Sequence, residues 1–439
     1  MINIIPNIIF TLILIISVGL FIRNIKKLIT VIKLGKAVNR FDNPGKRLTN
    51  MIRIALGQSK MVSKPVSGLL HVIVYVGFII INIELLEILI DGITGSHRFF
   101  SKYFNVSFYN FLIASFEVFA LLVLISVILF WTRRNLVKIK RFLSSEMKGW
   151  PKFDADNILY FEIVLMLLFL SMNATDLILQ ERNFDGYYKA GSFPVSSFMV
   201  PIFSSFDTST VYIFERVFWW LHIIGIFLFL NYLYYSKHLH ILLAFPNTYF
   251  ANLEDKGKFN VLESVKNEVI LMFYPEKASQ NSTNVEKFGA SDVLDLNWVQ
   301  LMNAYSCTEC GRCTSECPAN LTGKKLSPRK IMMDTRDRLE KVSKNISNNK
   351  GKFIDDGDRL LDNYISKEEL WACTSCNACV EACPINIDPL SIIMDMRQYL
   401  IMEESSAHPD LNNMMSNIEN NGAPWPYNQQ DRELWIQEN

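Results

Sequence analysis

The chain has 439 residues, of which 50% are hydrophobic and 20% are charged, and its formal net charge is +1 at neutral pH. A soluble enzyme of this length usually carries more charge, and a balance this close to zero gives no electrostatic basis for binding nucleic acid. The distribution is uneven, because long apolar runs fill the first half and all eight cysteines lie beyond residue 300. We therefore expect a membrane-embedded half followed by a soluble half.

Five segments have the length and apolarity of membrane-spanning helices, which need about 20 residues at a rise of about 1.5 Å each. They are Ile4–Ile22, Val66–Ile90, Phe111–Trp131, Ile158–Leu179 and Val211–Tyr235. The first segment has neither a basic leader nor a small-residue cleavage site, so we expect an uncleaved helix rather than a signal peptide.

Basic residues set the expected orientation, since cationic connections stay in the cytoplasm. They gather between the first and second segments and between the third and fourth, whereas the other two connections are mixed or nearly neutral. The cations are Arg23, Lys26, Lys27, Lys33, Lys46, Arg47, Arg53, Lys60 and Lys64, then Arg133, Arg134, Lys138, Lys140 and Arg141. We expect a multi-pass protein of the inner (cytoplasmic) membrane, with its N-terminus outside and its cysteine-rich half in the cytoplasm.

Histidines mark two of the five segments. His71 lies near the start of the second segment, His222 lies within the fifth, and His238 and His240 lie at the cytoplasmic end of the fifth. Ionisable groups in a bilayer are costly and are functional candidates by default. If the fifth helix reaches residue 240, His222 and His240 share one face, because helical turns take about 3.6 residues, and His238 faces nearly the opposite way. The alternative is that these histidines are structural.

Carboxylates gather toward the outer ends of the segments. One interpretation is a salt-bridge network that closes the helix ends, and the other is a proton path or quinone pocket, because quinone chemistry moves protons with electrons. The residues are Glu84, Glu87, Glu117, Asp176 and Glu215, which is followed by Arg216.

Two cysteine motifs of the form C-x2-C-x2-C-x3-C-P follow. They are Cys307, Cys310, Cys313 and Cys317 before Pro318, and Cys373, Cys376, Cys379 and Cys383 before Pro384. This spacing is the bacterial ferredoxin signature for [4Fe–4S] clusters, in which the fourth cysteine binds the other cluster. We therefore assign Cys307, Cys310, Cys313 and Cys383 to one cluster, and Cys373, Cys376, Cys379 and Cys317 to the other. Disulfides are disfavoured in the cytoplasm, and the spacing does not suit structural zinc.

The motifs belong to an internal repeat. Tyr305-Ser306-Cys307-Thr308 corresponds to Trp371-Ala372-Cys373-Thr374, and Ser327-Pro328 opens a stretch that corresponds to the one opened by Asp388-Pro389. We expect Ser327 and Asp388 to cap helices with proline at the first position, and Ser366 with Glu369 to form a capping box. We expect a surface loop at Asn345–Asp358 and an irregular polar tail after Glu404, whose Trp425 and Trp435 dock on this domain or on a partner.

The motifs resemble two known families. Leu70-His71-Val72, Trp219-Trp220-Leu221-His222 and Tyr235-Ser236-Lys237-His238-Leu239-His240 resemble the dihaem cytochrome b fold of the respiratory nitrate reductase gamma subunit and the membrane cytochromes of heterodisulfide reductases. This resemblance implies that His71 and His240 bind a haem near the cytoplasm and that His222 belongs to an outer haem. The family's second histidine on span two is replaced by Ile81 and Asn82, so we expect one haem b, with two haems as the alternative. A His71–His222 pair stays open.

The cysteine half resembles the two-cluster α-helical ferredoxin module of heterodisulfide reductase C subunits. We expect an all-α fold with a membrane cytochrome b-like domain at 1–245, a helical connector at 246–303, the ferredoxin domain at 304–404 and a tail at 405–439. No dinucleotide loop, P-loop or hydrolase triad is present in the sequence. The chain is expected to bind two [4Fe–4S] clusters and haem b, and to pass electrons between a soluble cytoplasmic redox subunit and membrane quinone. The resemblance implies that this subunit is Cys-rich or of flavin type. The alternatives are a haem-free membrane-anchored ferredoxin and an iron–sulfur redox sensor.

Overall fold

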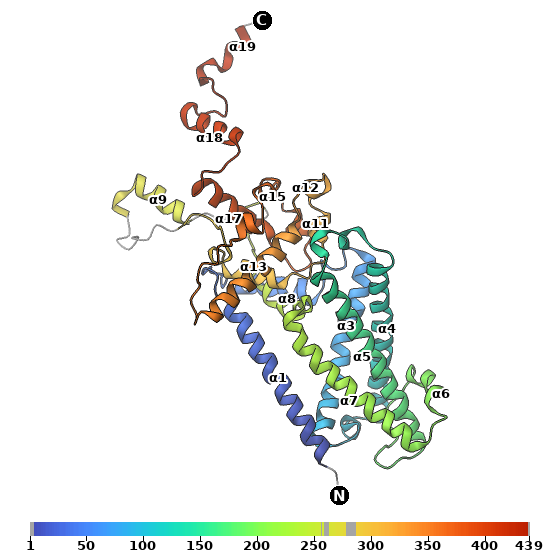
Figure 1. Cartoon of the computed structure of the whole chain (residues 1–439). Coiled ribbons are helices and arrows are strands. Elements are labelled where there is room, and N and C mark those ends of the chain that lie inside the picture. Colours follow the sequence, from blue (N-terminus) through green and yellow to red (C-terminus); the bar gives the residue numbers. More distant parts are fainter. Residues whose placement is uncertain (1–3, 256, 259–262, 278–286, 438–439) are drawn as a thin grey trace.

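The computed structural model of the chain describes residues 4–255, 257–258, 263–277 and 287–437. These residues form helices and connecting segments, and over the described ranges the only strand-like pairings are two isolated backbone bridges, Lys36 with Asn297 and Leu361 with Ile365. The expected all-α class is confirmed for this part of the chain. The membrane-type helices and the cysteine-rich helices occupy opposite ends of the molecule (Figure 1).

The helices vary from single turns to 32 residues. The longer ones are α1 (Ile5–Ile32), α2 (Pro44–Met51), α3 (Pro65–Thr94), α4 (Val106–Asn135), α5 (Trp150–Glu181), α7 (Thr208–Tyr232), α8 (His240–Tyr249), α9 (Glu263–Phe273), α10 (Trp298–Ser306), α13 (Pro328–Asn348), α17 (Pro389–Met402) and α18 (Pro409–Asn421). The short ones are α6 (Val200–Phe203), α11 (Arg312–Ser315), α12 (Pro318–Leu321), α14 (Leu360–Asn363), α15 (Lys367–Trp371), α16 (Ala378–Ala382) and α19 (Leu434–Gln437).

Five described helices are long and apolar enough to cross a membrane; four contain their expected segments, and the first begins one residue later than expected, at Ile5. They are α1, α3, α4, α5 and α7 with the turn that follows it to Tyr235. Each is apolar around its whole circumference and leaves many large hydrophobic side chains exposed, such as Ile15, Leu69 and Leu228. That pattern suits a lipid environment rather than water.

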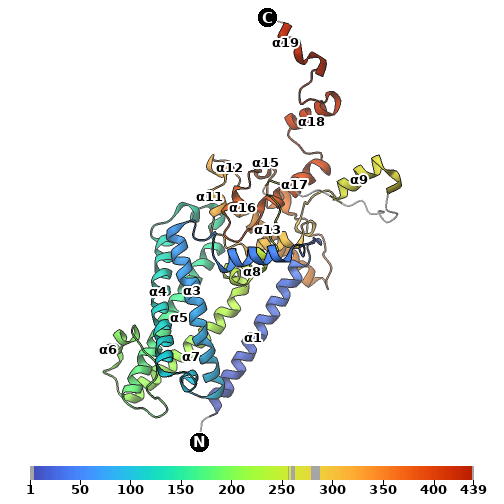
Figure 2. The same cartoon turned by 180° about the vertical axis from the view of Figure 1, so that it is seen from behind.

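The membrane-type bundle is built by neighbouring antiparallel helices. α3 packs on α4, α4 on α5 and α5 on α7, and α1 leans against α3 and α7 from the side (Figure 2). Aromatic side chains fill the interior, among them Phe10, Phe116 and Phe169. The start of α3, the end of α4 and the end of α7 all lie next to the cysteine-rich domain. The loops at this end of the bundle therefore contact that domain (Figure 1).

An apolar junction joins the bundle to the cysteine-rich domain. Leu28 and Ile32 at the end of α1 pack against Leu239 and Leu243 around the start of α8, and against Met302 of α10. These side chains are nearly or fully buried. Because this contact is apolar and removed from solvent, it stabilises the packing of the two halves against each other.

The cysteine-rich domain has its own core between α10, α13 and α17. Leu301, Ile331 and Ile392 are fully buried there, and Cys307, Cys317 and Cys383 lie at its edge. The expected caps are confirmed: Ser327 accepts a hydrogen bond from the Lys330 backbone, Asp388 accepts one from Ser391, and Ser366 with Glu369 forms a reciprocal capping box. The caps fix where the helix after each cluster loop begins.

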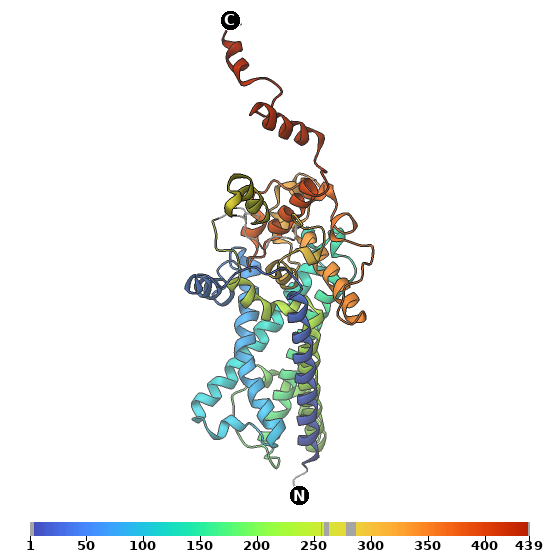
Figure 3. The same cartoon turned by 90° about the vertical axis from the view of Figure 1, so that its left-hand side faces the viewer.

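Two local expectations were wrong. The loop expected at Asn345–Asp358 begins later, because α13 continues to Asn348. The tail after Glu404 is not irregular, since Pro409–Asn421 forms α18. The tail leads away from the rest of the molecule (Figure 3), and Trp425 and Trp435 are 49% and 68% exposed. These tryptophans therefore do not dock on the cysteine-rich domain.

Candidate iron–sulfur and haem site

Each cysteine motif folds as a loop between two helices. Cys307 caps the end of α10, Cys313 lies in α11, and Cys317 precedes Pro318 at the start of α12. In the second motif Cys379 lies in α16 and Cys383 ends that helix before Pro384. The helices α11 and α16 pack against each other. The two motifs therefore face one another, as is required if each motif supplies its fourth cysteine to the cluster of the other motif.

Burial and mutual proximity of the thiols support the crossed assignment. The pKa of Cys307 is raised to about 12, mainly by burial and also by the nearby thiols of Cys310 and Cys383. Burial raises the pKa of Cys383 to about 11, with Cys310 as the next cause. In the other group, burial raises the pKa of Cys373, and Cys317 adds to the effect. Such thiols stay protonated at neutral pH until a metal binds them, and binding then releases their protons.

Thiols of both motifs surround one space. Cys307, Cys310, Cys313 and Cys383 line a narrow cavity together with Cys379. A ring of thiols around a common space fits a cluster better than a zinc ion.

The two loops share their backbone conformation. Glu309 in the first motif has φ +56° and Ser375, at the same place in the second, has φ +55°; Gly311 and Asn377 correspond in the same way, with φ +71° and +60°. A left-handed backbone is uncommon for residues other than glycine. Its recurrence at matching positions shows that the internal repeat seen in the sequence extends to the fold of the cluster loops.

The repeated arginines of α13 and α17 brace these loops. Arg397 donates to the carbonyl oxygens of Leu370, at 3.0 and 2.6 Å, and of Cys373. Its counterpart Arg336 pairs with the carboxylate of Glu309 at 2.8 Å. Both arginines belong to the repeat that is visible in the sequence, but repetition alone did not identify them as supports of the cluster loops.

The fifth membrane helix does not continue to residue 240, which corrects the conditional expectation that His222 and His240 share a helical face. α7 ends at Tyr232, a short turn follows, and Ser236 is extended with φ −110° and ψ +150° before α8 begins at His240. The oxygen of Ser236 accepts a hydrogen bond from the His238 backbone and caps the next turn. This break turns His240 back over the end of the bundle.

Three of the four expected histidines gather at the end nearest the cysteine loops. The rings of His71 and His240 lie 6.4 Å apart between centroids, and those of His238 and His240 lie 5.5 Å apart. His238 therefore does not face away from His240, as a continuous helix would have required. Its Nε2 lies 3.7 Å from a carboxylate oxygen of Glu162.

The His71–His240 pair has the spacing that one metal between two imidazoles requires. Rings that bind a metal from opposite sides have centroids roughly 6 Å apart, because each metal–nitrogen bond is about 2 Å long. The Nδ1 of His240 donates to the carbonyl oxygen of Lys237 at 3.0 Å, which leaves its Nε2 available. The Nδ1 of His71 is buried and has no hydrogen-bond partner within the described ranges. A haem iron is a group that these two residues fit.

His222 is separated from this pair. It is buried in α7, its Nδ1 donates to the carbonyl oxygen of Leu165 at 3.0 Å, and its ring lies 5.8 Å from Phe169. At the matching depth of α3, Asn82 donates to its own helix at Phe78. The structure thus gives His222 no histidine partner among the described residues of α3.

The carboxylates at the opposite end of the bundle form a buried ion-pair network. They surround Arg98 and His97, two residues for which the sequence predicted no role. Arg98 pairs with Asp176 at 2.7 Å, and His97 Nε2 lies 3.0 Å from the same carboxylate. Glu84 lies 3.9 Å from Arg98, and its other oxygen has no hydrogen-bond partner in the described part of the chain. These groups line a cavity of about 680 Å³. The expected salt-bridge network is therefore present, beside a space large enough for a small molecule.

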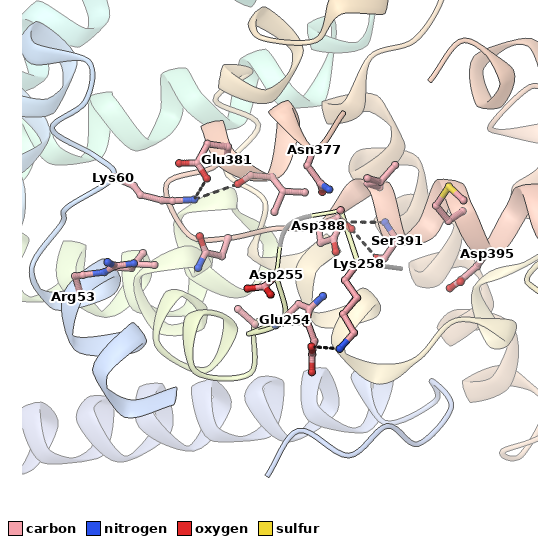
Figure 4. A pocket seen from close by; sticks show the side chains of 18 of the residues that line it. Arg53, Lys60, Glu254, Asp255, Lys258, Asn377, Glu381, Asp388, Ser391 and Asp395 are labelled. Carbon is pink, nitrogen blue, oxygen red and sulfur yellow. Dashed lines mark hydrogen bonds and ion pairs between the residues drawn. The ribbon is translucent and has the colours of Figure 1, made fainter. Parts of the chain in front are cut away.

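A second hollow, of about 260 Å³, lies beside the second cysteine motif (Figure 4). Positive and negative side chains line this hollow and form ion pairs with one another. Lys60 lies 3.8 Å from Glu381, and Lys258 pairs with Glu254 at 2.5 Å. Asp388, which also lines it, is engaged in capping α17. The side chains of this hollow therefore hold neighbouring segments together, which is not the arrangement of a catalytic site.

Comparison with known proteins agrees with the cysteine geometry. Residues 306–387 match the family model described as a 4Fe-4S dicluster domain. Over 96% of its length the chain is 28% identical to the "Probable iron-sulfur-binding oxidoreductase FadF" of Bacillus subtilis (strain 168), and over 97% it is 25% identical to the "EtfAB:quinone oxidoreductase" of Syntrophomonas wolfei. It spans 59% of the length of each of these relatives.

The cysteine half alone has further relatives. Over 29% of the chain it is 28% identical to a heterodisulfide reductase C-like protein of Archaeoglobus profundus, of which it covers 54%. No solved structure gives a significant match. The C-terminal half is thus a two-cluster [4Fe–4S] domain related to heterodisulfide reductase C-like proteins, attached to five membrane-type helices in a chain similar to iron–sulfur oxidoreductases.

Proposed function

We propose that the chain is the membrane-bound electron-transfer subunit of an oxidoreductase complex, with residues 1–245 as a cytochrome b-like domain and residues 304–404 as the ferredoxin domain. The observation that carries the proposal is the placement of His71 and His240, 6.4 Å apart, at the end of the bundle that contacts the first cysteine loop. Two clusters supply one-electron carriers at one end of this path, and a b-type haem supplies one at the other.

The cysteines divide into a set near the membrane and a set near the surface. Arg312, beside Cys313, donates to the backbone oxygens of Lys60 and Met61 at 3.1 Å, just before α3. Cys376 in the second motif is the exposed cysteine of the eight. A soluble partner can therefore approach Cys373, Cys376, Cys379 and Cys317, while Cys307, Cys310, Cys313 and Cys383 lie toward the haem ligands.

The partner and the acceptor follow by analogy. The relative from Syntrophomonas wolfei is named an EtfAB:quinone oxidoreductase, which supports an EtfAB-type redox partner and a quinone for this chain as well; the soluble, flavin-type character of that partner follows from the resemblance of the cysteine half. The cationic connections on the side of the cluster domain support an orientation with that domain in the cytoplasm and the N-terminus outside. Fold relationship alone does not carry these assignments, so they belong to the same proposal.

Haem content of histidine variants tests the proposal. We expect a pyridine haemochrome assay on the anaerobically purified protein to give one haem b per chain. His71→Ala and His240→Ala should each remove it, because each deletes one axial ligand. His222→Ala should retain it, because His222 lies apart from the pair and bonds to Leu165.

The outcomes separate the alternatives. His238→Ala is the matched control, since His238 neighbours His240 but its Nε2 faces Glu162; the variant should keep its haem. Loss of haem in the His222 variant with retention in the His240 variant would instead support a His71–His222 pair. Absence of haem from the unmodified protein would leave a membrane-anchored ferredoxin and contradict the cytochrome assignment.

A further inference from the structure

A single lysine contacts both the expected haem ligand and the first cluster loop. The carbonyl oxygen of Lys237 accepts the hydrogen bond from His240 Nδ1 at 3.0 Å, and its backbone N–H donates to Asp154 at 3.0 Å. Its ammonium group donates to the carbonyl oxygen of Pro151 at 2.7 Å and pairs with the carboxylate of Glu309. Lys237 therefore lies between the membrane helices and the cysteine loop.

Glu309 continues the connection into the cluster domain. It lies between Cys307 and Cys310, its side chain is only 2% exposed, and its second oxygen pairs with Arg336 of α13 at 2.8 Å. Lys237 and Arg336 are themselves 10% and 14% exposed. Three charges buried together in this way are costly to leave unpaired, so the contact fixes the geometry of the groups that make it.

The repeat shows that this carboxylate is not needed to fold the loop. Ser375 occupies the equivalent position in the second motif with the same left-handed backbone. It carries no charge, and Arg397 braces that loop through carbonyl oxygens instead. The first loop thus has a carboxylate, Glu309, at the position that faces the membrane helices, whereas the second loop has an uncharged serine, Ser375, at the equivalent position.

We propose that Lys237 and Glu309 are positioning residues that hold the cluster bound by the first loop at a fixed distance from the haem ligand His240, and that their charges tune that cluster. The inference rests on the proposed function, since it takes a haem at His240 as given. With a haem held by His71 and His240, the step concerned would transfer one electron between the first-loop cluster and that haem, so that one is oxidised as the other is reduced, with no proton in the balance. The residues act only through the position and local charge of the two groups.

Two variants test the proposal through effects of opposite sign. Glu309→Gln removes a negative charge beside the first cluster and should raise the reduction potential of that cluster, whereas Lys237→Met removes a positive charge and should lower it. Both should slow electron transfer from photoreduced clusters to haem, because each variant removes one partner of the buried charge contact that fixes the position of the first loop. The readouts are EPR redox titration and time-resolved haem absorbance after flash reduction by a deazaflavin.

The controls separate positioning from misfolding. Lys237→Arg keeps the charge and should retain the wild-type rate. Glu309→Ser copies the second loop and should behave as Glu309→Gln does, with full cluster occupancy. Lys64→Met removes another lysine that joins the membrane half to the first motif, at Glu316, but this pair is about half exposed and should change neither readout.

Three results would overturn the inference: unchanged rates in both charge-removing variants, potentials that shift in the same direction in both, or a Lys237→Arg variant as slow as Lys237→Met. These results are distinguishable from failure of the proposed function. A protein without b-type absorbance removes the haem assignment itself, and with it this inference, whereas a protein with haem and unaltered kinetics removes only the positioning role.

Discussion

At the scale of single residues, Asp395 shows how burial couples the cluster domain to pH. It lies in α17, where its carboxylate accepts a hydrogen bond from Gln300 of α10 at 2.6 Å. Burial raises its pKa to about 6, with the hydrogen bond from Gln300 opposing and the charge of Asp388 adding to the shift. The native state therefore holds this proton more tightly than the unfolded chain does, whose aspartates titrate near pH 4.

The sign of the resulting pH dependence follows directly. The stability that protonated Asp395 contributes is complete below the unfolded pKa and is lost as the pH rises through about 6. We expect Asp395→Asn to stabilise the domain by about 1 to 2 kcal/mol at pH 7.5, and by little at pH 4.5. An asparagine oxygen can still accept from Gln300.

The thermal midpoint of the cluster-loaded protein at the two pH values measures this difference. Asp410→Asn, whose side chain is 87% exposed in the tail, is the control and should change the midpoint at neither pH. Equal stabilisation by Asp395→Asn at both pH values would show that the carboxylate is not protonated in the native domain.

At the scale of elements, we propose that each cluster takes ligands from both cysteine loops. α11 and α16 face each other, and the buried Cys383 lies near Cys310 rather than beside its own motif's Cys376. We expect Cys383→Ser to abolish the same EPR signal of reduced protein as Cys307→Ser does, because both thiols bind one cluster. Cys317→Ser should match Cys373→Ser in the same way.

A different pattern would contradict the crossing. If Cys383→Ser resembled Cys373→Ser, each motif would hold its own cluster and α11 and α16 would be neighbours for another reason. Thr308→Ser is a suitable control in the first loop, since it lies between two ligands without carrying a thiol and should leave both signals intact.

The same scale shows what the sequence could predict and what it could not. Hydropathy and cysteine spacing are local properties, so the five spans, the repeat and the caps at Ser327, Asp388 and Ser366 were predictable. The break between α7 and α8 was not, because no proline or glycine marks it. It depends on Ser236 and on Asp154, which receives the Lys237 backbone N–H.

The sequence also could not predict the ion pairs that form between distant segments. In the sequence, Glu309 is one of the unspecified positions between two cysteines of the motif. Its partners Lys237 and Arg336 come from distant segments. Arg98 and His97 are loop residues in the sequence and become partners of Asp176 only when the bundle assembles. Spacing identifies groups that act together within one element, whereas these contacts exist only between elements.

At the scale of the whole molecule, the candidate ligands of the redox groups extend from the exposed part of the cysteine-rich domain to the near end of the membrane helices. The exposed Cys376 marks the water-facing side, the first loop lies above the bundle, and His71 and His240 lie at its near end. The chain similarity to iron–sulfur oxidoreductases covers nearly its whole length.

The measurement that tests this account most directly is a reduced-minus-oxidised visible spectrum of the anaerobically purified, membrane-reconstituted protein, followed by addition of a quinone analogue. We expect sharp b-type bands on reduction with dithionite, superimposed on broad bleaching from two clusters, and reoxidation of both by the quinone. Broad bleaching alone, with no sharp bands, would contradict the central claim that this chain carries electrons between iron–sulfur clusters and a haem in the membrane.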